Sequence, residues 1–222
     1  MSRIPGFRKI RSIAENTLWL IFWPLIPCLF GEKRFEKLYR FRPDPWNYRG
    51  SEFEQEKYRR ILDAIPEGIH SVIEIGCSEG VFTEMLLEKG YTVIGVDISA
   101  IAIERAGKHL ERFGERVRLW KRDVTREAIE GRYDLLIIAE MLYYLGGPGH
   151  LRRLRAIFLS LVRGGGYLLL EHFHPSGKLI HNVFLESGVM RLLDETVYPH
   201  PDRDYLITLL QKRPDSREND RP

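Results

Sequence analysis

The sequence contains little cysteine, carries no strong excess of one charge and has no uncharged run long enough to cross a membrane. Its two cysteines, Cys28 and Cys77, lie far apart, which excludes a disulfide framework and indicates free thiols in a reducing compartment such as the cytoplasm. Because no cysteine or histidine spacing is typical of zinc ligands, we expect no metal site. The formal net charge of +3 excludes a chain that is basic throughout, so we expect no nucleic-acid partner.

Positive charge gathers in the N-terminal fifth of the chain. Residues 1–42 hold nine Lys or Arg against three Asp or Glu, whereas residues 43–222 hold 25 against 28. Residues 16–31 are uncharged, but a helix of that length would be roughly 24 Å long and would be interrupted by Pro24 and Pro27. Two interpretations stay open: residues 1–31 make peripheral contact with the cytoplasmic face of a membrane, or they cap the domain or its substrate pocket.

Strand and helix patterns alternate from residue 50 onward, which is typical of an α/β fold. We expect a doubly wound, Rossmann-like, mostly parallel sheet of seven strands with an antiparallel C-terminal hairpin, plus an N-terminal helical leader. The expected units are the leader at 1–43, a ligand-binding domain at 44–213 and a disordered tail at 214–222. The expected strands cover residues 71–75, 91–96, 116–120, 133–139, 167–173, 195–198 and 205–211. The expected helices cover residues 81–89, 99–113 and 151–162, and the run of glycines at 164–166 is expected to end the last of them.

A glycine turn follows the first expected strand directly, in the segment Gly76-Cys77-Ser78-Glu79-Gly80. Gly76 allows the backbone to approach a ligand closely, and Gly80 allows the strand and the following helix to pack closely. Asp97 ends the second strand, 21 residues after Gly76, where a carboxylate accepts hydrogen bonds from both hydroxyls of a ribose. Asp123 follows the third strand, where it is placed to accept from an adenine amino group.

The main rival cofactor is a nicotinamide dinucleotide, whose fingerprint is G-x-G-x-x-G. Here the third position is Ser78 and the sixth is Val81, so only one of the three glycines is in place. An acid at the position of Asp97 occurs with both cofactors. The glycine spacing, Asp123 and the closing hairpin favour S-adenosyl-L-methionine.

Over roughly residues 44–211 the sequence resembles class I S-adenosylmethionine-dependent methyltransferases. The motifs of that class are matched in order by Glu74-Ile75-Gly76-Cys77-Ser78-Glu79-Gly80, Val96-Asp97-Ile98-Ser99, Asp123-Val124, and Tyr133-Asp134 with Ala139-Glu140. Within the class, Asp44-Pro45-Trp46-Asn47-Tyr48 and Tyr143-Tyr144-Leu145 are similar to the nodulation protein S branch. Members of that branch N-methylate the deacetylated sugar end of a chitin-like oligosaccharide.

The resemblance implies a role for each matched residue. Glu74 orients the methionine amino group of the cofactor, and Asp97 holds its ribose. Trp46 and Tyr48 form a lid over the cofactor or, alternatively, a packing motif at the start of a helix. The other expected cofactor contacts are the turn residues Gly76, Cys77, Ser78 and Gly80, followed by Ile98, Asp123 and Val124 around the adenine.

Methyl transfer to nitrogen or oxygen requires an aligned acceptor and the removal of a proton. Glu140 directly follows the fourth strand and is the predicted base, with a helix-capping or cofactor-binding carboxylate as the alternative. His172 and His174 end the fifth strand, where strand alternation puts both on one face and Glu171 on the other. Either histidine is a candidate base near neutral pH, with solvated histidines at a strand end as the alternative.

Tyr143 and Tyr144 are candidates to contact the acceptor, although aromatic residues after a strand also occur in cores. We therefore predict an S-adenosylmethionine-dependent methyltransferase that acts on nitrogen or oxygen of a small-molecule, glycan or lipid-linked acceptor. The alternatives are a catalytically silent, membrane-recruited binding module on the same fold and a nicotinamide-dependent oxidoreductase. The sequence contains no signal for the oligomeric state.

Overall fold

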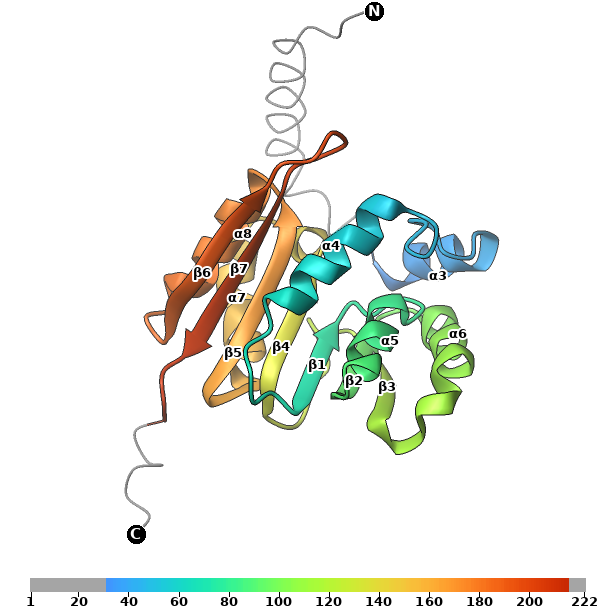
Figure 1. The fold of residues 1–222 in the computed structure, drawn as a ribbon, viewed down its shortest axis with the longest axis horizontal. Helices are drawn as coiled ribbons and strands as arrows, with labels where there is room; N and C mark the ends of the chain where they lie inside the picture. The colour runs from blue at the N-terminus through green and yellow to red at the C-terminus, as the bar shows by residue number, and fades with distance from the viewer. Residues whose placement is uncertain (1–30, 216–222) are drawn as a thin grey trace, which may run out of the picture.

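A seven-stranded sheet organises the chain in the computed structural model, which describes residues 31–215 (Figure 1). The spatial order of the strands is β3-β2-β1-β4-β5-β7-β6; β7 pairs antiparallel with both of its neighbours, β5 and β6, and all other pairs are parallel. The strands are β1 (Ser71–Ile75), β2 (Thr92–Asp97), β3 (Val117–Lys121), β4 (Tyr133–Ala139), β5 (Val162–Phe173), β6 (Met190–Tyr198) and β7 (Tyr205–Lys212). This arrangement confirms the predicted mostly parallel sheet and its antiparallel C-terminal pair.

Helices cover both faces of the sheet. On one face lie α4 (Glu52–Asp63), α5 (Val81–Glu88) and α6 (Ala100–Leu110), and on the other lie α7 (Pro148–Ser160) and α8 (Ser176–Leu185). Helix α3 (Glu32–Phe41) and the 3-10 turns η2 (Glu111–Arg116) and η3 (Leu142–Leu145) complete the elements of residues 31–215. Ser51 and Ser99 cap α4 and α6, each accepting a hydrogen bond from a backbone N–H three residues on.

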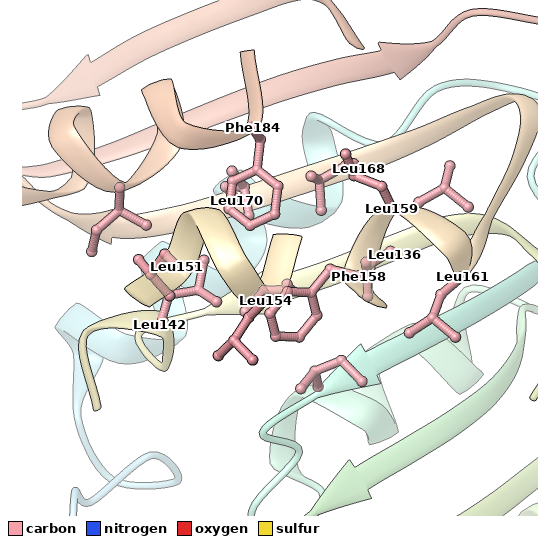
Figure 2. Packing of buried hydrophobic residues seen from close by; sticks show 14 of the residues in the cluster. Leu136, Leu142, Leu151, Leu154, Phe158, Leu159, Leu161, Leu168, Leu170 and Phe184 are labelled. Atoms are coloured by element: carbon pink, nitrogen blue, oxygen red, sulfur yellow. The ribbon is translucent and has the colours of Figure 1, made fainter. Parts of the chain in front are cut away.

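Two apolar clusters hold the layers together, one on each face of the sheet. Strand alternation explains the division, because Leu136 and Ile138 of β4 point to one face and Leu135 and Ile137 to the other. Figure 2 shows the α7 side, where Phe158 lies against β4 and β5. Since β4 is buried on both faces, it forms the continuous apolar run expected of a central parallel strand.

The C-terminal half differs from the prediction in three elements. β5 begins at Val162 and runs through the glycines at 164–166, which were expected to separate a helix from the strand. The pairing register with β4 shifts here, and Gly165 adopts φ +73°, so the glycines absorb an irregularity inside the strand. β6 begins at Met190, five residues before the expected start.

Helix α8 was not expected at all, because Pro175 and Gly177 lie at its start. Proline is tolerated at the beginning of a helix, and a Cβ on Gly177 would approach the carbonyl oxygen of His172 to 3.0 Å. The glycine therefore lets the helix pack directly on β5.

The anchor-or-cap question for residues 1–31, the assignment of Cys28 as a free thiol and most of the predicted tail lie outside the described residues. Within residues 31–215, no helix combines the length and apolar character needed to span a membrane.

Candidate functional site

A cavity opens at the carboxyl ends of β1, β2 and β4 and contains about 700 Å³ of space, including its mouth. Strand order reverses between β1 and β4, and open α/β sheets bind ligands at such a switch point. The residues that line the cavity are Phe35, Tyr39, Trp46, Tyr48, Ile75, Gly76, Ser78, Val96, Asp97, Ile98, Arg122, Asp123, Val124, Ala139, Glu140, Met141, Tyr144 and Leu145.

The carboxylate of Asp97 holds the glycine turn through hydrogen bonds, an arrangement that we call the Asp97 clasp. One carboxylate oxygen accepts from the backbone N–H of Ser78 and the other from that of Ser99, each at 2.9 Å. The turn itself needs a left-handed backbone, with φ +85° at Gly76 and +53° at Ser78. Burial raises the pKa of Asp97 to about 6, against the lowering effect of these backbone donors. The clasp positions a carboxylate and a tight backbone turn on the same wall of the cavity.

Two of the predicted turn contacts lie elsewhere. Gly80 does not line the cavity, and a Cβ there would come within 2.8 Å of Leu110 in α6, so this glycine serves packing. Cys77 is buried and borders only a smaller, adjoining polar cavity.

Glu74 lies beneath the turn, in the wall of the smaller cavity. Its carboxylate accepts a 2.6 Å hydrogen bond from the hydroxyl of Thr83 in α5. Burial raises the pKa of Glu74 to about 7, so its charge is poised to change near neutral pH. A cation held beside this carboxylate would favour the ionised form.

Asp123, Val124 and Ile98 line the large cavity, as expected. One oxygen of Asp123 is already occupied, since it accepts from the backbone N–H and the hydroxyl of Thr125 at 2.9 and 2.7 Å. The second oxygen lies 3.6 Å from the guanidinium of Arg126. Asp123 therefore organises its own turn and keeps one oxygen for a ligand.

An aromatic wall closes the cavity opposite the sheet. The rings of Trp46 and Tyr48 stack at 5.7 Å, and Tyr39 meets Trp46 edge-on at 5.6 Å. The hydroxyl of Tyr39 also donates a 2.7 Å hydrogen bond to the hydroxyl of Ser78, which joins α3 to the glycine turn. Phe35 packs edge-on against Tyr144, so α3 is part of the site.

Glu140 extends from the end of β4 into both cavities. Its backbone has φ +49°, a conformation that costs energy for a residue with a side chain. The hydroxyl of Tyr143 donates a short hydrogen bond to its carboxylate. Tyr143 is buried and does not line the cavity, whereas Tyr144 does.

A buried charge cluster adjoins Glu140. The Lys57 ammonium of α4, only 1% exposed, lies 2.8 Å from Glu54, 3.6 Å from Glu140 and 3.9 Å from Glu171. Arg203, which is 47% exposed, approaches Glu140 to 3.5 Å. These contacts are ion pairs without aligned hydrogen bonds, because Lys57 Nζ, Glu140 Oε1 and both Glu171 oxygens have no hydrogen-bond partner.

The two inner carboxyl groups of the cluster are in different states. Although burial raises the pKa of Glu140, the opposing charges of Lys57 and Arg203 prevail and lower it. Burial raises the pKa of Glu171 well above its ordinary value despite the attraction of Lys57. Of the two, Glu140 beside the cavity is therefore the stronger acid, and Glu171 behind it keeps its proton to higher pH.

The structure corrects the prediction for His172 as a base near neutral pH. The ring is fully buried, and burial lowers its pKa to about 3. Nε2 accepts from the backbone N–H of Leu142 at 3.1 Å, so Nδ1 carries the proton and donates to His181 Nε2 at 3.0 Å. His181 in turn donates from Nδ1 to the hydroxyl of Thr208 at 2.7 Å. Strand alternation predicts on which face a side chain lies, but it does not predict that another element, here α8, covers that face.

His174 is half-buried and borders neither cavity. Its backbone N–H donates to the carbonyl of Asp204 at 2.9 Å. Its predicted role as a base therefore has no geometric support.

The sequence analysis did not identify Phe35, Tyr39 or Lys57 as site residues. The spacing of Phe35 and Tyr39, one helical turn apart, was a usable signal for one face of a helix. Lys57 had no signal, because a lysine on a polar helix is normally solvated.

A family model described as nodulation protein S (NodS) matches residues 32–172, which is more than half of the chain. Nodulation protein S of Rhizobium tropici is 30% identical over 128 residues, covering 57% of this chain and 53% of that protein. The ubiquinone biosynthesis O-methyltransferase of Nitrosomonas europaea is 28% identical over 139 residues, covering 60% of this chain and 57% of that protein. The chain thus spans little more than half the length of these relatives.

Among solved structures, the N-methyltransferase NodS from Bradyrhizobium japonicum WM9 in complex with S-adenosyl-L-homocysteine has a TM-score of 0.73 and 20% sequence identity. The match covers 82% of this chain and 99% of the chain of that solved structure. The likeness confirms the predicted fold. Of these relatives and structures, one is named as an O-methyltransferase and one as an N-methyltransferase, and none is named as a nicotinamide enzyme.

Proposed function

Because the chain belongs to the nodulation protein S (NodS) family, we propose that it is a methyltransferase that uses S-adenosyl-L-methionine and methylates nitrogen or oxygen of an acceptor. The observation that carries this proposal is the clasp of Asp97 on the glycine turn at the switch point of the sheet. A ribose diol donates two hydrogen bonds, and the Asp97 carboxylate still borders the cavity after accepting from the two backbone donors.

The remaining walls fit the same cofactor. Ile98 and Val124 supply apolar contacts for a flat base, and Asp123 keeps one carboxylate oxygen at its edge. Glu74, next to Gly76 in the smaller cavity, suits an ammonium group. These residues make up a polar and an apolar end in one continuous site.

When bound, the cofactor supplies a methyl group already activated on a sulfonium centre. The protein then has to align the acceptor and exclude water, and alignment of this kind can contribute roughly 7–11 kcal/mol to lowering a barrier. Trp46, Tyr39 and Tyr144 exclude water on the open side. Glu140 lines the cavity and its pKa is lowered, so its carboxylate is the group that accepts the proton that the acceptor loses.

The acceptor itself is proposed only as a class. Its reactive atom is a nitrogen or an oxygen that carries a proton, since either requires the base that Glu140 provides. Small molecules, glycans and lipid-linked molecules all remain within this class.

Calorimetry with S-adenosyl-L-homocysteine tests the cofactor part. We expect the wild type to bind, Asp97→Asn to bind at least tenfold more weakly because it loses a charge-assisted acceptor, and the exposed control Asp63→Asn to bind as the wild type does. Absence of binding by the wild type contradicts the proposal.

A labelled-methyl screen on separated lipid, glycan and small-metabolite fractions tests transfer. Glu140→Gln is expected to keep cofactor binding and to lower transfer by about 10²–10⁴-fold. Cofactor binding by the wild type without transfer to any fraction would instead support the silent binding module.

A further inference from the structure

Helix α3 has two chemically distinct faces. Phe35 and Tyr39 line the cavity. Lys33, Lys37 and Arg40 recur at positions i, i+4 and i+7, so they share the opposite side of the helix, and all three are exposed. We call these three residues the α3 cationic face. The helix lies at the periphery of the molecule beside α6 (Figure 1).

Nothing in the described part of the chain neutralises the α3 cationic face. Both acids of the helix are used elsewhere, since Glu32 pairs with Lys121 at 2.7 Å and Glu36 accepts from the backbone N–H of Ala100. Within residues 31–215, no ion pair is formed by any member of the face. Like charges at i+3 and i+4 repel one another weakly, and an anionic surface beside the face would relieve that repulsion.

Apolar surface adjoins the charge. Phe41, on the same side of α3, is 76% exposed, more than any other large apolar residue of the described chain. In the sequence, the helix follows directly on the uncharged residues 16–31, which include Trp19 and Trp23. Basic residues next to exposed aromatic and apolar ones are the pattern of a lipid interface, whereas an RNA surface needs wider positive charge.

We propose that the α3 cationic face and Phe41 dock on a membrane surface that contains anionic phospholipid. The same helix would then have lipid on one side and the cavity on the other, separated by about 10–12 Å, the width of a helix. This inference about the acceptor rests on the proposed function. The acceptor is then a molecule that is dissolved in the membrane or linked to a lipid.

Vesicle flotation of the full chain tests the docking. The wild type is expected to float with vesicles of phosphatidylglycerol and phosphatidylcholine in equal parts, and not with phosphatidylcholine alone. The triple variant Lys33→Gln/Lys37→Gln/Arg40→Gln should bind about 100-fold more weakly, because each cation contributes roughly fivefold at an anionic surface. Phe41→Ser should weaken binding without changing its dependence on salt.

A matched control removes three exposed cations elsewhere, with Arg59→Gln/Lys89→Gln/Arg118→Gln, and should bind as the wild type does. The docking is overturned if the α3 triple variant also binds like the wild type, or if neutral vesicles suffice. It is equally overturned if single-stranded RNA binds the wild type more tightly than the vesicles do and the triple variant loses that RNA binding.

Calorimetry with S-adenosyl-L-homocysteine on the same proteins separates this inference from the proposed function. The α3 cationic face does not border the cavity, so the triple variant should retain the wild-type affinity. A wild type that binds vesicles but not S-adenosyl-L-homocysteine removes the proposed function and leaves the docking intact.

Discussion

Lys57→Met is expected to lower the free energy of unfolding by about 3–5 kcal/mol, the usual cost of removing one partner from a buried ion pair. In the wild type, Lys57 and Arg203 are the cations that face the carboxyl groups of this cluster, which are Glu54, Glu140 and Glu171. Without Lys57, an excess negative charge stays in a site where the other described cation, Arg203, is half exposed.

The matched control lies on the same helix. Arg60 pairs with Glu56 at 3.4 Å, but both side chains are nearly half exposed, so Arg60→Met should cost at most about 1 kcal/mol. Denaturant unfolding of both variants and the wild type measures the difference. Since the cost in Lys57→Met comes from unpaired carboxylates, adding Glu140→Gln, which removes one of these charges, should restore part of the stability.

The loss of unfolding free energy in Lys57→Met should also depend on pH. The pKa of Glu140 is lowered in the fold, so this group contributes stability above its unfolded pKa near 4.5 that is lost as the pH falls further. Lys57→Met removes most of this contribution, so the gap between variant and wild type should be widest above pH about 4.5 and shrink as the pH falls below that value. A cost below about 1 kcal/mol at neutral pH, or one equal to that of Arg60→Met, would refute the view that these charges are desolvated.

Three further results are expected. Affinity for S-adenosyl-L-homocysteine should rise with pH through about 7 as Glu74 ionises beside the ligand's ammonium, and calorimetry on Glu74→Gln should show only the rise near pH 6 that comes from Asp97. Tyr39→Phe removes the hydrogen bond to Ser78 and should cost about 0.5–1.5 kcal/mol in denaturant unfolding, so an unchanged midpoint would contradict that bond. The folded pKa of His172 near 3 lies below its unfolded value of 6.5, so its stabilisation, at most about 5 kcal/mol, is present above 6.5 and lost as the pH falls toward 3; His172→Gln should lack this slope relative to the wild type.

The parts of the site that are local in sequence could be predicted from it. The glycine turn follows its strand without interruption, and Asp97, Asp123 and Glu140 each follow a strand directly. Because parallel strands bring their carboxyl ends to one edge, the order of strands along the chain was enough to bring these residues together. On the large cavity lie Asp97, Asp123 and Glu140 and, from the glycine turn, Gly76 and Ser78.

The surroundings of His172 could not be predicted in this way. Alternation along β5 correctly separates it from Glu171, but it does not say which face another element covers. Helix α8 covers the histidine face, and the backbone N–H of Leu142 together with His181 occupies both ring nitrogens. The residue that looked like a base is a buried link between elements.

Local periodicity and the topology of parallel sheets were enough to predict the strand–turn–helix order, the acids at the strand ends and hence the place of the cavity. The contacts of Lys57 in α4 with Glu140 and Glu171, and the orientation of α3 with Phe35 and Tyr39 toward the cavity and its cations toward solvent, could be seen only in the folded molecule. The physical reason is that protonation states and exposed faces depend on which distant segments pack together, and burial of a charge is a property of that packing.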